Sequence, residues 1–231
     1  MRKQVHHHTP KQLDVVRWTA SLGAITAEAL ALRLGVSSAS ARGRLSVLQR
    51  RGLLSRHKLF VEAPALFTVT RAGLRASEAH GIKRCELSAG GAHHLAVCAM
   101  VAAGLELCYP DHRLVGEREL RRDERDLGRP LASAAVGWAE TGASGVHYPD
   151  LVLWPSDAHS LPVAVEVELT IKSPRRLAGI CRAWARCRWV AGVLYLVDDP
   201  VRPPLERAIE HARASEQVVV VPLNALPQPT D

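Results

Sequence analysis

Two short stretches decide the fold, HYPDLVLW at residues 147–154 and VAVEVELT at residues 163–170. Each predicts a strand of apolar and β-branched residues that carries carboxylates. Asp150 opens the first strand. Glu166 and Glu168 stand two residues apart on the second, so their side chains share one face of the sheet. Carboxylates that converge from neighbouring strands suit a divalent metal ion and the hydrolysis of a phosphodiester.

The sequence around these strands predicts an alternation of helices and strands. The late strands are apolar almost throughout, which indicates a mixed sheet covered by helices, of the α+β or α/β class. The predicted elements are a helix at 92–107, a strand at 114–120 that carries Glu117, a loop at 121–146, strands at 150–154 and 163–169, a helix at 174–189 with a basic face, a strand at 191–197, a helix at 204–215 and a strand at 217–223. We expect one domain over residues 92–226.

Composition bounds the class of protein. Hydrophobic residues make up 47% of the 231-residue chain, which excludes global disorder. The N-terminal residues lack the apolar core of a signal peptide, and no run of about 18 apolar residues is evident, so we expect no membrane span. The five cysteines are odd in number and show no CxxC spacing, which argues against a zinc site or a disulfide scaffold. These features predict a cytoplasmic protein.

Charge is distributed unevenly along the chain. Residues 1–85 hold 15 Lys and Arg against 4 Asp and Glu, a balance of +11, whereas the remainder carries −4 of the total +7. A basic N-terminal third beside a mildly acidic remainder predicts that the first part binds nucleic acid. A solvated basic surface without a partner is the alternative.

The N-terminal third predicts three helices. The first runs from Leu13 to Leu22, the second opens after Thr26 as N-cap, and the third is capped by Ser37 or Ser38 and runs to about Arg51. A tight turn that contains Gly35 joins the last two, which predicts a helix-turn-helix.

Two strands at 56–60 and 65–70 follow as a wing, and Thr70 caps a closing helix. This order, with the phrase LQRRGLL at 48–54, resembles winged helix-turn-helix DNA-binding domains over residues 11–80, with a linker at 81–91. Some winged helices contact only proteins, which is the alternative. The residues expected to contact DNA are Ser38, Ser40, Arg42, Arg44, Arg50, His57 and Lys58.

The second half is similar to the PD-(D/E)xK nuclease-like fold, through Pro149-Asp150 and Glu166-Val167-Glu168. Nearly the whole chain resembles the replication-relaxation family. That resemblance is carried by the winged helix, HHLAV at 93–97, GEREL at 116–120, Pro149-Asp150 and EVELT at 166–170. It implies DNA binding in the replication, mobilisation or control of plasmids, integrative elements and phages, without implying a reaction.

The acidic cluster is open to three interpretations. An active nuclease would use Asp150, Glu166 and Lys172 in catalysis, with Asp150, Glu166, Glu168 and Glu117 holding Mg²⁺ or Mn²⁺. The position where the nuclease pattern has lysine is Glu168, so Lys172 would have to swing back from four residues further on. An inactive nuclease-like fold is the second interpretation, and an exposed acidic strand face paired with helix arginines is the third.

We therefore predict a sequence-specific double-stranded DNA-binding protein of a mobile element, a regulator or accessory factor in replication, transfer or transcription. A metal-dependent DNA endonuclease is the alternative. Expected partners are DNA, a second copy of the chain in a homodimer, and replication or conjugation proteins. We expect no membrane partner, no certain cofactor and a nucleoid-associated location.

Overall fold

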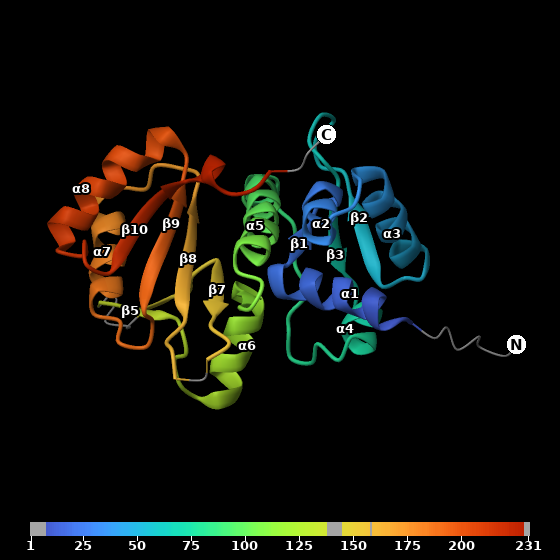
Figure 1. Ribbon diagram of the computed structural model, residues 1–231, viewed down its shortest axis with the longest axis horizontal. Coiled ribbons are helices and arrows are strands. Elements are labelled where there is room, and N and C mark those ends of the chain that lie inside the picture. Colours follow the sequence, from blue (N-terminus) through green and yellow to red (C-terminus); the bar gives the residue numbers. More distant parts are fainter. Residues whose placement is uncertain (1–7, 138–144, 158, 229–231) are drawn as a thin grey trace, which may run out of the picture.

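The computed structural model describes residues 8–137, 145–157 and 159–228, and these form a mixed α+β structure (Figure 1). The N-terminal elements lie on one side, a five-stranded mixed sheet lies on the other, and helices α5 and α6 lie between them. The N-terminal elements are α1 (Pro10–Leu22), β1 (Ala24–Ile25), α2 (Ala27–Leu34), α3 (Ser38–Arg50), β2 (Leu54–His57), β3 (Leu66–Val69) and α4 (Arg71–Ala76).

The remaining elements build the sheet and its covering helices. They are α5 (Ala89–Cys108), β4 (Arg113–Gly116), α6 (Glu117–Leu127), β5 (Ala134–Val136), β6 (Gly145–His147), β7 (Leu151–Trp154), β8 (Val163–Glu168), α7 (Pro174–Ala185), β9 (Gly192–Val197), η1 (Asp199–Val201), α8 (Arg202–Ala212), β10 (Val218–Pro222) and η2 (Leu223–Ala225).

Local capping sets the N-terminal helices. The side chains of Thr26, Ser37 and Thr70 accept hydrogen bonds from the third residue after each, at the starts of α2, α3 and α4. Gly35 ends α2 in the left-handed conformation, with φ of 59°. These caps confirm the predicted starts of the three helices. Behind them β1, β3 and β2 form an antiparallel three-stranded sheet in that order.

The large sheet has the strand order β10-β9-β8-β7-β4. β4 pairs with β7 and β7 with β8 in antiparallel fashion. A short connection at 155–162 lets the chain reverse between β7 and β8, whereas α6, β5 and β6 lie between β4 and β7 along the chain. β8, β9 and β10 are parallel, and α7 and α8 provide the crossovers between them. Residues of β8 alternate between the two faces, so Val165 packs toward α5 and Ala164 toward α7.

The hydrophobic core on the α5 side continues into the N-terminal elements. Leu30 of α2, Leu105 of α5 and Val165 of β8 belong to one cluster of buried residues. The second cluster fills the opposite face of the sheet, with Trp184 of α7 and Leu205 of α8. α5 therefore lies between the N-terminal elements and the sheet, and it carries apolar residues on both sides.

Among the described residues, one helix is long and apolar enough to cross a membrane by length and composition alone, and that helix is α5. Within its most apolar window 44% is buried inside the protein. Packing against two layers requires apolar residues on both sides of a helix, and the buried residues of α5 meet that requirement.

The predicted strand at 114–120 is wrong in its second half. The strand β4 stops at Gly116, and Glu117 is the first residue of α6. Glu117 and Glu119 lie in the first turn, where the helix dipole favours acids, and Gly128 ends α6 in the left-handed conformation. The predicted loop at 121–146 is correspondingly replaced in part by α6, β5 and β6, and residues 138–144 lie outside the described residues.

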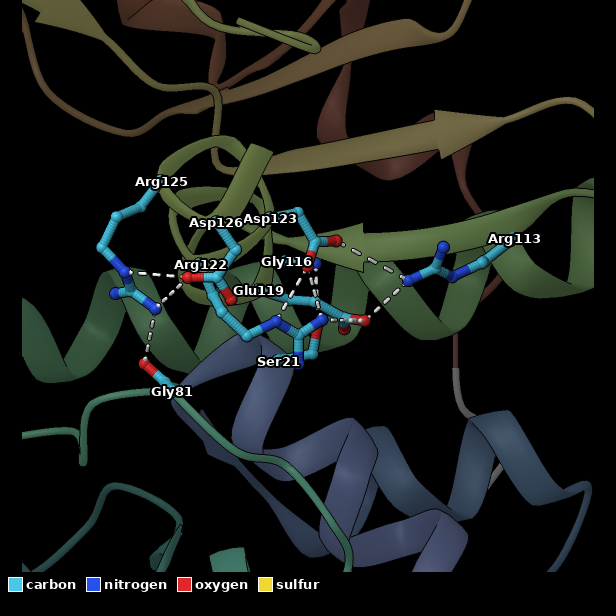
Figure 2. Close-up of polar contacts among 9 residues, drawn as sticks. All are labelled: Ser21, Gly81, Arg113, Gly116, Glu119, Arg122, Asp123, Arg125 and Asp126. Atoms are coloured by element: carbon cyan, nitrogen blue, oxygen red, sulfur yellow. Dashed lines mark hydrogen bonds and ion pairs between the residues drawn. The ribbon is translucent and has the colours of Figure 1, made fainter. Parts of the chain in front are cut away.

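Polar contacts around α6 join the two halves of the molecule (Figure 2). The backbone N–H of Gly116 donates to Ser21 Oγ on α1 at 2.8 Å, and Arg125 reaches the backbone oxygen of Gly81. Arg113 and Arg122 both contact Glu119. Gly116 lies so close to α1 that a Cβ would overlap the backbone oxygen of Ser21.

Candidate functional site

Asp150 lies where β7 begins, between helix α5 and the neighbouring strand β8. One carboxylate oxygen contacts His94 Nε2 at 2.9 Å, and the other accepts the backbone N–H of Val167 at 2.8 Å. The hydrogen bond that His94 makes to the Asp150 carboxylate raises the pKa of His94, with burial opposing the increase. The side chain of Asp150 is 19% exposed and that of His94 is 38% exposed, so solvent reaches this pair.

Glu166 is buried on the face of the sheet that α7 covers. Its Oε1 atom contacts His147 Nε2 at 2.6 Å and accepts the indole N–H of Trp184 at 3.1 Å. Burial raises the pKa of Glu166, although the contact with His147 opposes the increase. Burial lowers the pKa of His147, but the Glu166 carboxylate more than offsets this, so that pKa is raised overall.

Glu168 is also buried, and Lys172 Nζ contacts its carboxylate. The charge of Lys172 also opposes the increase in the pKa of both His94 and Glu166. The lysine therefore turns back toward the acids from beyond the end of β8. The interpretation as an exposed acidic face is wrong, because Glu166 and Glu168 are only 5% and 4% exposed.

Glu117 contributes to this region through its backbone. Its N–H donates to the backbone oxygen of Asp150 at 3.0 Å, while its carboxylate pairs with Arg121 one turn along α6. The structure thus brings Asp150, Glu166 and Lys172 into one charged cluster with Glu168, and it directs the Glu117 carboxylate to a different partner.

The set of atoms best placed to bind a metal differs from the predicted one. Among the described residues, His94, Cys98 and Asp150 have ligand atoms that all lie within 4.8 Å of one another. Cys98 Sγ lies 3.3 Å from His94 Nε2. Cys98 is buried in the core cluster, and it is not among the site residues predicted from the sequence. Its spacing of four residues from His94, which puts both on one face of a helix, is the signal that could have found it.

Helix α3 carries five of the residues that the sequence predicts to contact DNA. Ser40, Arg42, Arg44 and Arg50 are exposed, and Ser38 is half-buried at the start of the helix. Arg42 forms a 3.6 Å ion pair with Glu28 of α2 while its side chain remains 60% exposed.

In the predicted wing, His57 and Lys58 contact their own protein. The His57 ring hydrogen-bonds Thr68 Oγ1 at 2.9 Å, and Lys58 Nζ donates to the backbone oxygen of Ala63 at 2.6 Å. Lys58 is exposed, whereas His57 is half-buried.

A groove of about 930 Å³ lies between α7 and α8, lined mainly by apolar surface with cationic side chains among it. Its cationic lining residues are Lys172, Arg175, Arg182 and Arg207, with His211 beside them. Because Lys172 also contacts Glu168, the groove borders the acidic cluster. Trp184, on α7, is fully buried and packs in the core.

Comparisons with known proteins give little. No protein-family model matches the chain, and no curated protein matches it. The crystal structure of protein VC1899 from Vibrio cholerae aligns with 95% of this chain and 54% of its own, at a TM-score of 0.33 and 10% identity. The chain therefore spans about half of that protein, and a likeness this weak supports no conclusion about function.

Proposed function

We propose that the protein binds double-stranded DNA in a sequence-specific way through a winged helix-turn-helix formed by α1–α4 and β1–β3. The observation that carries this is the division of α3 into two faces. Arg42, Arg44 and Arg50 face solvent, while Leu45 and Leu48 are buried against the rest of the N-terminal elements. α3 lies on the outer side of those elements, away from α5 (Figure 1).

An exposed helix with small residues near its start suits a major groove. Ser40 allows the backbone to approach closely, and the arginines can contact phosphates or guanine edges. In this proposal Lys58 serves as a wing contact after releasing the Ala63 oxygen, and His57 orients the wing through Thr68. The +11 balance of residues 1–85 adds the long-range attraction that phosphate binding uses.

The biological setting follows from the resemblance to the replication-relaxation family. In that setting the protein is a regulator or accessory factor of a mobile element, and it acts in replication, transfer or transcription. It works in the nucleoid, alongside replication or conjugation proteins. A homodimer would read two half-sites of an operator.

The test is DNA binding by the full chain. Sites selected from random duplexes should bind with an affinity that falls steeply as salt rises. Arg42→Ala should cost about 1–3 kcal/mol if Arg42 reads a base, and Arg44→Ala should flatten the salt dependence if Arg44 contacts phosphate. Arg75→Ala, on exposed α4, is the control with the same loss of charge. Absence of salt-sensitive binding would remove the proposal.

A second candidate function is metal-dependent DNA cleavage by a PD-(D/E)xK nuclease-like domain. The observation that favours it is the position of Lys172, which joins the buried acids although the sequence places it four residues beyond Glu168. Asp150 and Glu166 would hold Mg²⁺ or Mn²⁺, and Lys172 would stabilise the charge that develops on the phosphate. The groove between α7 and α8 would carry the nucleic-acid backbone.

Cleavage is tested separately from binding. Linear, supercoiled and branched DNA should be cut with Mg²⁺ or Mn²⁺, and Asp150→Asn should abolish cutting while DNA binding is retained. Lys172→Gln should slow cutting, whereas Lys83→Gln, which removes an exposed lysine before α5, should leave it unchanged. If none of these substrates is cut, the acidic cluster has no such activity.

A further inference from the structure

Three different donor atoms meet where α5 passes the start of β7. His94 and Cys98 are separated by four residues, so both point from the same face of α5 toward Asp150. Their contacts are close, 2.9 Å from His94 Nε2 to Asp150 Oδ1 and 3.3 Å from Cys98 Sγ to His94 Nε2. The donor set combines one imidazole nitrogen, one sulfur and one carboxylate oxygen.

These separations are close to those of a tetrahedral zinc site. Bonds of about 2.0–2.3 Å imply ligand-to-ligand distances of about 3.3–3.7 Å at tetrahedral angles. The contacts of 2.9 and 3.3 Å need to open by only a few tenths of an ångström on average to admit an ion. The whole set already lies within 4.8 Å.

The chemistry of the donors selects among metals. Imidazole and thiolate suit Zn²⁺ and related transition metals, whereas Mg²⁺ prefers oxygen donors. A thiolate at Cys98 and a carboxylate at Asp150 would together neutralise a divalent ion. On binding, the S–H bond of Cys98 breaks and a sulfur–metal bond forms, while His94 Nε2 gives up the proton that it donates to Asp150 and forms a nitrogen–metal bond. The thiol proton goes to solvent, and the imidazole proton goes to Nδ1 or to solvent, so nothing is oxidised or reduced.

The surroundings orient the ligands and leave a way in. The second oxygen of Asp150 is held by the Val167 N–H at 2.8 Å, which fixes the carboxylate as outer-shell partners do in metal sites. Cys98 is 5% exposed and lies beneath His94, whose side chain is 38% exposed. An ion would enter past His94 and keep its fourth position toward solvent, as catalytic rather than structural zinc sites do.

We propose that His94, Cys98 and Asp150 form a three-ligand site for Zn²⁺ or a similar transition metal. The site is distinct from the Mg²⁺ or Mn²⁺ arrangement of Asp150 and Glu166, although it shares Asp150. It stands whether or not the protein cuts DNA, because metal binding is measured without a nucleic-acid substrate.

The test is metal binding by the full chain. Because His6, His7 and His8 would also bind transition metals, all three are first replaced by alanine. The metal-free protein is titrated with Zn²⁺ by calorimetry and with Co²⁺ by absorption. We expect one ion per chain and a thiolate-to-cobalt charge-transfer band, with no competition from equimolar Mg²⁺.

The variants assign the ligands. Cys98→Ser should lose the charge-transfer band. Cys98→Ser and His94→Gln should each weaken Zn²⁺ binding by about 100-fold or more, because loss of a residue that only supports a ligand already costs up to about 100-fold. Cys187→Ser, which alters another buried cysteine beside Ser133, should keep both properties. Binding that is absent, or unchanged in Cys98→Ser, would overturn the proposal.

A measurement on the alanine-substituted parent protein guards against a Cys98 variant that does not fold. X-ray absorption of the zinc-loaded chain should show one sulfur neighbour at about 2.3 Å together with nitrogen and oxygen neighbours at about 2.0–2.2 Å. A shell of nitrogen and oxygen alone would also overturn the proposal. Neither result depends on DNA cleavage, so failure here is distinguishable from failure of the proposed function.

Discussion

The contact between His147 and Glu166 binds protons more tightly in the folded protein than in the unfolded chain. Burial raises the pKa of Glu166 from its ordinary value of 4.5. The nearby carboxylate raises the pKa of His147 from 6.5 despite the opposing effect of burial. Both shifts make folding stability fall as pH rises, because in each case the native state retains a proton at a pH where the unfolded chain has lost it.

We therefore expect the stability contributed by this pair to be present at low pH and to be lost as pH rises. The loss begins above 4.5 for Glu166 and above 6.5 for His147, and it continues through the raised pKa of each group. The slope is at most about 1.4 kcal/mol per pH unit for each proton. Urea unfolding of metal-free protein from about pH 5 to about pH 9 measures it.

The comparison that isolates this effect is the double variant His147→Gln with Glu166→Gln, which removes both titrating groups. The difference in unfolding free energy between wild type and variant should shrink as pH rises. A difference that grows with pH would contradict the assignment.

Gly116 is required because α1 approaches the end of β4 so closely. We expect Gly116→Ala to destabilise the protein by about 1–3 kcal/mol, since its Cβ would overlap the backbone of Ser21 and disturb the hydrogen bond between the two residues. Gly179→Ala, inside α7 with no atom within 4 Å of the added Cβ, should instead be neutral or stabilising by up to about 1 kcal/mol. Chemical denaturation of both variants checks the pair, and similar losses would show that the close approach is not decisive.

At the same scale, the sequence could identify the acids but not their partners. Alternation along β8 was enough to place Glu166 and Glu168 on one face. The contact of Glu166 with His147 depends on how β6 lies against the sheet, and no local pattern encodes that. The near approach of Cys98 to Asp150 likewise depends on the packing of α5 on β7.

One buried carboxylate of α6 organises the turn that follows the helix. Glu124 is 6% exposed, and its Oε1 accepts the backbone N–H groups of Leu131, Ala132 and Ser133, while Oε2 accepts the Ser133 hydroxyl. The acid thereby satisfies the turn that leads from α6 into β5. It replaces the backbone partners that a regular element would provide.

Removal of that carboxylate should cost more than a typical surface change. We expect Glu124→Ala to lower the unfolding free energy by about 3 kcal/mol or more, because several backbone donors are left without an acceptor. Glu124→Gln should cost less, since its amide oxygen still accepts. Glu210→Ala, on the exposed side of α8, should change stability by no more than about 0.5 kcal/mol. Equal losses in the two Glu124 variants would show that acceptor geometry does not matter there.

The sequence predicted elements well wherever a local signal set their ends. The starts of three helices could be predicted from their capping residues, because a cap depends only on neighbouring residues. These residues are Thr26, Ser37 or Ser38, and Thr70. α6 was missed because its first turn continues an apolar strand and its remaining surface is mostly charged. Its signals were the acids of the first turn and the final Gly128, and these become persuasive only once the i,i+4 pair of Glu117 and Arg121 is recognised.

For the molecule as a whole, element order was sufficient to predict a mixed sheet covered by helices. The extent of shared core was not predictable. An apolar helix such as α5 shows that it is buried, but its composition does not say which layers cover it. The sequence predicts separate domains at residues 11–80 and 92–226. In the structure, one cluster of buried residues extends from Leu30 through Leu105 to Val165 and so crosses that boundary.

That continuous core predicts cooperative unfolding of the full chain. Separate domains joined by a linker would unfold at different denaturant concentrations, whereas layers that share buried surface lose it together. Trp18 of α1 and Trp184 of α7 lie in different clusters and report on the two ends. We compare one variant whose single remaining tryptophan is Trp18 with another whose single remaining tryptophan is Trp184. The urea transitions followed by tryptophan fluorescence should have the same midpoint and slope in both variants. Two separated midpoints would instead favour independent domains, and would mean that the packing of α2 on α5 contributes little to stability.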